Sequence, residues 1–287
     1  MTSLPATLCH LNGEYVPLDQ AKVSVLDRGF IFGDGIYDVV PVYERKLFRF
    51  AQHMQRLARS LAKVRMANPH TGDEWLQLCR RLIAAQPADD QLIYIQVTRG
   101  VTVRNHAMPK AIAPTVFAMS NPLMLPSARE LAEGVACVSA QDFRWARGDI
   151  KSISLLGNVL ARQISADAGA VETVMFRDGW LTEASASNVW LVRAGQVIGV
   201  PKSQWVLEGI RFDLLRELCE QEGIGYDLRP VSQDEARQAD ELLLSSASKE
   251  VLPVTRLDDA PVGSGRPGPV FARLHAAYQR AKATQLV

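Results

Sequence analysis

Asp149-Ile-Lys-Ser-Ile-Ser-Leu-Leu-Gly-Asn158 combines a helical pattern with a lysine in an unusual place. Apolar residues from Ile153 to Leu160 recur at helical spacing and predict a helix to about residue 168, with Lys151 just before it. A lysine at a helix start is usually a solvated charge, although a cation is disfavoured at the positive end of the helix dipole. The alternative is a buried amine that attacks a carbonyl group. The choice depends on whether other residues supply a cofactor site.

The composition is that of a globular protein. The 287 residues suffice for one large domain or two of ordinary size, and 47% of them are hydrophobic against 22% charged. A formal net charge of +1 gives no indication of nucleic-acid binding. The four cysteines are far apart, as in reduced cytoplasmic proteins, and no apolar run reaches membrane-spanning length. We therefore expect a soluble, cytoplasmic protein that binds neither nucleic acid nor membrane.

Short β-type runs and turns are predicted for residues 11–50. One such run is Val23–Asp27, and it leads into a patch with glycines at 29, 33 and 35. This patch fits either a tight hairpin end or a loop that faces a ligand, and by itself it favours the hairpin. The pattern further predicts strands at 36–43, 47–50, 92–98 and 115–119, and helices at 51–66 and 73–86.

Two pairs of basic residues lie in this first half. His53 and Arg56 share a helix face, where a solvated surface is the default interpretation and an anion clamp the alternative. Arg104 and His106 are two residues apart in a segment expected to be extended, so their side chains should point the same way. Because guanidinium groups bind carboxylates in a bidentate manner, this second pair predicts a carboxylate pocket.

A proline-containing segment without periodicity separates two halves that both mix strands and helices. We expect an α+β protein with a domain at 1–119, a linker at 120–128 and a second domain at 129–287. Within the second domain, strands are predicted at 135–139, 172–176, 189–192 and 242–246. Helices are predicted at 206–221, at 232–239 and at the end of the chain, and an Asp178-Gly179 turn precedes Glu183.

Several features of the second half suit one ligand. Gly209-Ile-Arg211 at a helix start offers backbone N–H groups and a positive dipole end, which is a phosphate site. The serines at 245, 246 and 248 could add donors, and Glu183 could hold a ring nitrogen in its protonated form. An amine, a phosphate site and a carboxylate for a pyridinium together indicate pyridoxal 5'-phosphate.

Five motifs together resemble the class IV (fold-type IV) aminotransferases. In chain order they are Asp27-Arg-Gly-Phe-Ile-Phe-Gly-Asp-Gly-Ile-Tyr37, His53-Met-Gln-Arg-Leu57, Asp149-Ile-Lys-Ser152, Leu155-Leu-Gly-Asn158 and Thr182-Glu-Ala-Ser-Ala-Ser-Asn188. The family comprises D-amino-acid transaminases, branched-chain aminotransferases and aminodeoxychorismate lyase. The resemblance implies a smaller N-terminal α/β domain and a larger C-terminal domain with a mixed, barrel-like sheet and helices.

The resemblance also implies roles for individual residues around pyridoxal phosphate. Lys151 matches the Schiff-base lysine, which also carries a proton, and Glu183 matches the carboxylate that pairs with the pyridine nitrogen. Arg56 matches the arginine that holds the phosphate, and Leu207 matches the apolar residue against the ring. The remaining expected phosphate contacts are Gly209, Ile210, Arg211, Ser246 and Ala247. The D-amino-acid transaminases have threonine where Arg211 stands and a hydroxyl residue where Ala247 stands.

Substrate choice is implied by the first half. Arg104-Asn-His106 matches the Arg-x-His signature of D-amino-acid transaminases, in which this pair and a tyrosine matching Tyr37 bind the substrate α-carboxylate. In those enzymes the pair comes from the partner subunit, so a homodimer with composite active sites is implied. Asp38 stands where the family usually has glutamate.

The activity implied is transamination between a D-amino acid and a 2-oxo acid. The expected reaction converts D-alanine and 2-oxoglutarate to pyruvate and D-glutamate. A branched-chain L-aminotransferase or an aminodeoxychorismate lyase is the alternative within the family. A catalytically silent cofactor-binding protein is the alternative outside enzymes, but a binding protein would need neither Lys151 nor Glu183.

Overall fold

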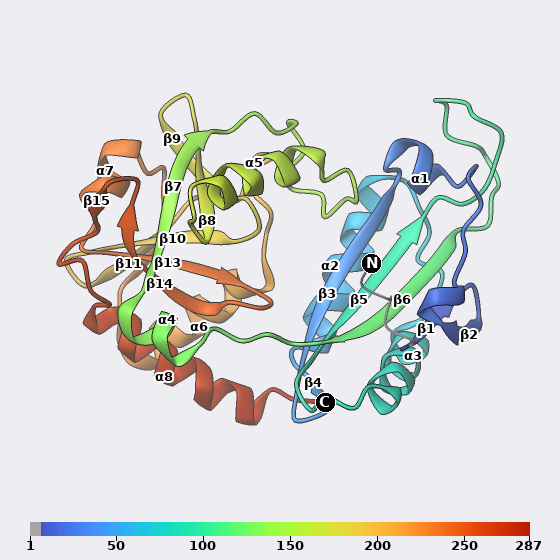
Figure 1. The fold of residues 1–287 in the computed structure, drawn as a ribbon, viewed down its shortest axis with the longest axis horizontal. Helices are drawn as coiled ribbons and strands as arrows, with labels where there is room; N and C mark the ends of the chain where they lie inside the picture. The colour runs from blue at the N-terminus through green and yellow to red at the C-terminus, as the bar shows by residue number, and fades with distance from the viewer. Residues whose placement is uncertain (1–6) are drawn as a thin grey trace. The chain divides into compact units, whose positions relative to one another are not determined.

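The computed structural model describes residues 7–287, which form two compact units (Figure 1). The first unit comprises the chain up to Met124, together with Ile150–Leu155 and Gln285–Val287. The second comprises Leu125–Asp149 and Leu156–Thr284. No helix in this described part of the chain combines the length and the apolar character that crossing a membrane requires. Both units mix strands and helices, which confirms the α+β prediction.

The first unit is built on an antiparallel sheet. Its strands follow the order β2-β1-β6-β5-β3-β4, with the long strands β6, β5 and β3 in adjacent positions. Their bounds are β1 Leu8–Leu11, β2 Glu14–Pro17, β3 Gly35–Tyr43, β4 Lys46–Leu47, β5 Gln91–Thr98 and β6 Thr115–Pro122. A 3-10 turn at Leu18–Gln20 and a short helix α1, Arg28–Phe32, connect β2 to β3.

Two amphipathic helices cover one face of this sheet (Figure 1). They are α2, Phe50–Lys63, and α3, Gly72–Ala85, which begins with a Thr71–Glu74 capping box. Leu57 and Leu61 of α2 and Trp75 of α3 are buried against the covered side of the strands. The other face carries Tyr37, Tyr94 and other half-buried side chains, so β3 alternates between a dry core and an accessible surface.

The second unit contains a larger, mixed sheet. Its strand order is β12-β11-β10-β13-β14-β7-β8-β9, with β15 paired to β14, and the pairs β11–β12, β14–β7 and β7–β8 are parallel. The bounds are β7 Val135–Gln141, β8 Glu172–Arg177, β9 Trp180–Ala184, β10 Asn188–Arg193, β11 Gln196–Gly199, β12 Tyr226–Leu228, β13 Glu241–Ser246, β14 Glu250–Leu257 and β15 Ala260–Pro261. Asp178 and Gly179 both have positive φ, which confirms the predicted tight turn between β8 and β9.

Helices of the second unit pack on this sheet and on each other. They are α4 Ala128–Glu133, α5 Leu156–Asp167, α6 Ile210–Glu222, α7 Gln233–Arg237 and α8 Pro269–Thr284. Helix α6 packs against α8, which also contacts β13 and β14 (Figure 1). Glu241 caps α8, because its two carboxylate oxygens accept from the N–H groups of Val270 and Phe271, each at 2.9 Å.

The structure corrects the expectation about the helix near Lys151. Helix α5 begins at Leu156, five residues after the lysine, so the dipole argument does not apply to Lys151. The helical spacing from Ile153 onward also does not mark a core face. Leu156, Val159 and Leu160 are more than half exposed, and the buried residues of α5 are Ala161 and Ser165.

Three further expectations were wrong in detail. Val23–Asp27 forms a turn with exposed apolar side chains instead of a β-type run. The expected strand at 47–50 ends at Leu47, since α2 starts at Phe50. Helix α6 begins at Ile210 and not at Val206, because Gly209 is its N-cap.

Leu57→Ala should destabilise the first unit by about 2–5 kcal/mol, because it leaves a cavity in a core where Leu57 is fully buried. Gln55→Ala is the matched control on the same helix, and its exposed side chain should change stability by no more than about 0.5 kcal/mol. Urea unfolding followed by circular dichroism measures both. Equal effects of the two variants would contradict the assigned packing of α2.

Candidate active site

Lys151 lies in an extended segment that continues the sheet at the edge of β3. The Tyr37 N–H donates to the Lys151 carbonyl at 3.0 Å, and the Ile153 N–H donates to the Gly35 carbonyl at 3.0 Å. Lys151 Nζ lies 4.2 Å from the centroid of the Tyr37 ring, a cation–π contact that keeps the amine over the aromatic face. Two residues that are far apart in the sequence are thus brought together.

The glycine-rich patch is what lets this segment approach. Gly33 ends α1 in the left-handed region (φ 65°), and a Cβ on it would lie 2.6 Å from Ser154 Oγ. A Cβ on Gly35 would lie 2.8 Å from the Ile153 side chain. The patch is therefore neither the hairpin end nor simply a ligand-facing loop, since it is a capped helical turn against which the Lys151 segment packs.

Arg56 and His53 both contact Asp38, on the covered side of the sheet. Arg56 Nε and Nη2 donate to the two carboxylate oxygens at 2.9 and 2.8 Å, and His53 Nδ1 lies 2.7 Å from Asp38 Oδ1. Burial would raise the pKa of Asp38, but the charges and hydrogen bonds of Arg56 and His53 outweigh burial and hold that pKa well below 3.8. The predicted shared helix face is correct, but it is buried rather than solvated.

Arg104 and His106 lie in an exposed, bent loop instead of the extended segment we expected. Their side chains nevertheless converge on Phe32 of α1. The Arg104 guanidinium lies 5.3 Å from the Phe32 centroid, and the His106 ring centroid lies 5.2 Å from it. Among the described residues, neither side chain makes a hydrogen bond or ring contact to Tyr37. Tyr37 instead stacks on Tyr94, a residue that the sequence analysis missed.

In the second unit, Glu183 is a buried carboxylate at the end of β9. It accepts from Arg144 Nη1, from the Leu207 N–H at 2.9 Å and from Asn188 Nδ2 at 3.3 Å. Hydrogen bonds from a cation and two neutral donors favour the ionised form of a carboxylate. An ionised, immobile carboxylate is what a protonated pyridine nitrogen requires as a partner.

Arg144 belongs to a wider buried charge network. Its Nε and Nη2 donate to the two oxygens of Asp142 at 3.0 and 2.9 Å, and Thr182 Oγ1 donates to Asp142 at 2.9 Å. Burial would lower the pKa of Arg144, but the hydrogen bonds and charges of Asp142 and Glu183 raise it above its usual value. Sequence reasoning missed Arg144, because a lone arginine in a loop carries no periodic signal.

Asn188 connects the Glu183 carboxylate to the start of α6. Its Nδ2 donates to Glu183 and also to the Leu207 carbonyl at 3.0 Å. A Cβ on Gly209 would lie 2.3 Å from Asn188 Oδ1, so only glycine fits at this N-cap. The residue closes the Thr182–Asn188 motif, and this was the signal from which its role could have been inferred.

The start of α6 offers backbone donors for an anion. Its N-cap Gly209 makes no side-chain cap, which leaves the N–H groups of the first turn without that partner. The Arg211 guanidinium is buried and donates to Tyr278 Oη at 2.9 Å, so only its backbone N–H suits an anion at the helix start. Ser246 and Ala247 lie at the end of β13, whose Ser245 pairs with Asn188.

The second unit therefore fits pyridoxal phosphate by the chemistry of its donors. A buried carboxylate held by Arg144 suits the ring nitrogen, and the uncapped 13-residue helix suits the phosphate. In the first unit, Lys151 supplies an amine beside Tyr37. Among residues 7–287 no cluster of His, Cys, Asp and Glu has the make-up of a metal site.

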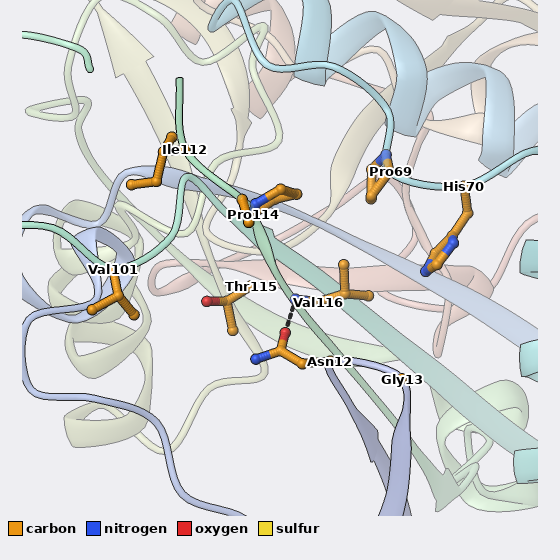
Figure 2. A pocket seen from close by; sticks show the side chains of 10 residues that line it. Asn12, Gly13, Pro69, His70, Val101, Ile112, Pro114, Thr115 and Val116 are labelled. Carbon is orange, nitrogen blue, oxygen red and sulfur yellow. Dashed lines mark hydrogen bonds between the residues drawn. The ribbon is translucent and has the colours of Figure 1, made fainter. Parts of the chain in front are cut away.

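A cavity of about 650 Å³ lies elsewhere in the first unit (Figure 2). It is bordered by the β1–β2 turn at Asn12-Gly13, by Pro69-His70 and by the segment from Ile112 to Val116, where Asn12 Oδ1 accepts from the Val116 N–H at 2.9 Å. None of the predicted site residues lines it. The cavity is thus separate from the Lys151–Tyr37 pair.

Asp38→Asn should destabilise the protein by about 3–5 kcal/mol at pH 7, because it leaves Arg56 buried without its ionic partner. A depressed folded-state pKa stabilises the fold above the unfolded value of about 3.9, and that contribution is lost as the pH falls through the folded pKa. The gap to the wild type should therefore narrow between pH 7 and pH 3 in urea unfolding. The exposed Asp259→Asn is the control, and a gap of the same size at both pH values would refute the assignment.

Comparison with known proteins identifies the family. Residues 35–257 match the family model for amino-transferase class IV. The chain is 37% identical over 271 residues to a D-alanine aminotransferase of Staphylococcus aureus, covering 94% of this chain and 96% of that protein. It is 35% identical to a D-alanine aminotransferase of Bacillus licheniformis over 268 residues, covering 93% and 94%.

Solved structures give the fold independently. A branched-chain amino acid aminotransferase of Escherichia coli superposes with a TM-score of 0.91 at 25% identity, covering 96% of this chain and 94% of that chain. A second branched-chain enzyme, from T.th. and solved with pyridoxamine 5'-phosphate, superposes with a TM-score of 0.89 at 24% identity, covering 97% and 94%. These neighbours confirm the two-domain, fold-type IV architecture. The family model and the sequence relatives together show that the chain belongs to the class IV aminotransferases, which are pyridoxal-phosphate-dependent enzymes.

Proposed function

We propose that this aminotransferase transfers the amino group of a D-amino acid, with D-alanine favoured, to 2-oxoglutarate, giving pyruvate and D-glutamate. The observation that carries the proposal is the convergence of Arg104 and His106 on Phe32. The pair matches the α-carboxylate site of D-amino-acid transaminases. The names of the relatives at 34–37% identity support the same donor class.

Pyridoxal phosphate, when bound, supplies an aldehyde carbon for the amino group and a ring that accepts electrons from the substrate Cα. Lys151 is the residue proposed to hold its aldehyde end and to move a proton at Nζ from one carbon to the other. Glu183 keeps the ring nitrogen protonated, with Arg144 and the Leu207 N–H fixing the carboxylate. Leu207 packs against the ring.

The phosphate is assigned to groups from several elements. The helix-start N–H groups of α6 supply neutral donors and the positive end of the dipole. Arg56, already held by Asp38, supplies the positive charge. The full set proposed for the phosphate is Arg56, Gly209, Ile210, Arg211, Ser246 and Ala247, with Arg211 acting through its backbone.

Stereochemistry follows from fixing the carboxylate. If Tyr37, Arg104 and His106 hold the α-carboxylate and Lys151 Nζ faces the Cα–H, the side chain has one remaining direction. The D-enantiomer places its side chain there, whereas the L-enantiomer would have to exchange side chain and hydrogen. Tyr37 lies beside the amine, as this geometry requires.

We further propose a homodimer in which Arg104 and His106 serve the partner's site. Within one chain the pair contacts Phe32 and makes no hydrogen bond or ring contact to Tyr37 among the described residues. The exposed apolar residues Leu156, Val159 and Leu160 of α5 offer a face for a second copy to cover.

A branched-chain L-aminotransferase is the second candidate within the family, because the solved neighbours carry that name. That likeness is at or below 25% identity and concerns the fold, whereas the Arg104–His106 pair is a matter of side-chain chemistry. A catalytically silent protein is disfavoured by the amine over Tyr37 and by the three donors on Glu183.

Reconstituted with pyridoxal phosphate, the enzyme should produce pyruvate from D-alanine and 2-oxoglutarate much faster than 2-oxo acids from L-leucine or L-alanine. The measurement is a panel of D- and L-amino acid donors with 2-oxoglutarate as the acceptor. A preference for L-leucine would assign the chain to the branched-chain alternative.

Lys151→Ala should abolish transamination, with loss of at least about 10³-fold in rate, while leaving the fold intact, because Lys151 supplies the amine that lies over Tyr37. Borohydride should fix the cofactor covalently to the wild-type protein and not to the variant, as read by intact mass. The exposed Lys46→Ala should retain both activity and covalent fixation. Covalent fixation in Lys151→Ala would place the reactive amine elsewhere.

A further inference from the structure

The loop that carries Arg104 and His106 is held by a single guanidinium. Arg28 Nη1 donates to the carbonyl of Asn105 and, at 3.5 Å, to that of Ala107, while Nη2 donates to the carbonyl of His106 at 3.4 Å. The loop has no helix or strand of its own and its side chains are exposed. Arg28 is therefore its main polar anchor.

Arg28 is itself rigidly placed. It is buried, and its Nε donates to Asp34 Oδ2 at 2.8 Å. Asp34 also accepts from Arg99 Nε at 2.7 Å and Nη2 at 3.0 Å, and Arg99 Nη2 donates to the Val64 carbonyl at 2.7 Å. Burial would raise the pKa of Asp34, but the hydrogen bonds and charges of Arg99 and Arg28 lower it, so the carboxylate stays charged between the two cations.

Phe32 completes this arrangement on the next turn of α1. The Arg28 guanidinium lies 4.8 Å from its centroid, on the same ring that Arg104 and His106 approach. One helical turn, capped by Asp27, thus presents a backbone anchor and a ring platform to the same loop. Cation–aromatic contacts of this kind are worth about 0.5–1 kcal/mol at exposed sites.

We propose that Arg28, fixed by Asp34 and assisted by Phe32, is a positioning residue for substrate-carboxylate recognition. It holds the backbone of Asn105–Ala107 in the conformation in which Arg104 and His106 can bind a carboxylate together. Ordering such a loop only when substrate arrives would weaken binding, because each residue fixed costs about 1–2 kcal/mol of conformational entropy. This inference rests on the proposed role of Arg104 and His106.

A purely structural role for Arg28 makes a different prediction. Such a role would lower stability without singling out carboxylate ligands. Arg45 provides the matched control, because its guanidinium also donates to backbone carbonyls, those of Ile83 at 2.8 Å and Gln86 at 3.1 Å, at the end of α3. These carbonyls lie outside the 104–107 loop.

The experiment compares Arg28→Lys with Arg45→Lys in the reconstituted holoenzyme. Lysine keeps the charge but cannot donate to three carbonyls in one plane. We expect Arg28→Lys to raise the KM for both D-alanine and 2-oxoglutarate, and the inhibition constant of propionate, by about 10-fold or more, as loss of charge-assisted hydrogen bonds implies. The amount of bound cofactor, read from its absorbance after gel filtration, should not change.

Arg45→Lys should leave all three constants within about 2-fold of the wild type, whereas Arg104→Ala should raise them at least as much as Arg28→Lys. Phe32→Leu keeps the apolar volume but removes the ring, and should raise the same constants by about 3-fold. If Arg28→Lys does not fold, Phe32→Leu decides alone.

Unchanged constants in Arg28→Lys, or in Phe32→Leu where it decides, would overturn the inference, and so would equal increases in Arg45→Lys. If the wild type prefers L-leucine, the proposed donor is wrong, and the same comparison with L-leucine still tests the positioning role. A wild type that transaminates no α-amino acid would overturn both.

Discussion

The backbone pairing between Tyr37 and Lys151 is the interaction on which the chemistry of this chain depends. It adds a segment from the middle of the sequence to the edge of β3, where a neighbouring strand would otherwise lie. Side chains can approach so closely there only because Gly33 and Gly35 carry none. A lysine placed by strand pairing is held by main-chain hydrogen bonds on both sides, so its amine is positioned without a helix. Precision of this kind is what covalent catalysis needs from a scaffold.

Buried arginine–carboxylate clusters recur beside each functional group. Asp38 holds Arg56, Asp34 holds Arg28, and Asp142 holds Arg144. In every case an aspartate fixes the arginine and leaves part of the guanidinium to act on something else. A buried ion pair is weak evidence for net stability, because desolvation offsets most of the attraction. The geometry it imposes explains better why charged pairs are placed at these positions.

Sequence periodicity predicted most long elements and failed where a surface is meant for something other than water. Helices α2 and α3 and strands β3, β5 and β6 were predicted because their alternation reports a core within one unit. In α5 the same apolar spacing describes an exposed face, so it placed the helix correctly but its buried side wrongly. Arg144 and Asn188 could not be found by periodicity, since their role depends on contacts across β9, β10 and the loop before α6. The roles of Lys151 and Glu183 came from motif order, because no local pattern separates them from ordinary lysine and glutamate.

The two kinds of similarity answer different questions. Branched-chain enzymes share this fold with TM-scores near 0.9 at about a quarter identity, which shows how little of the sequence the two sheets require. Donor choice then lies in short segments that the sheets merely hold, such as the 104–107 loop. A loop with exposed side chains has no core to fix it, so its shape must come from polar contacts such as the guanidinium of Arg28 on three carbonyls. Arg28 sits in the same capped turn whose last residue, Gly33, admits the Lys151 segment, and this turn therefore couples the reactive amine to the carboxylate-binding loop within a single unit.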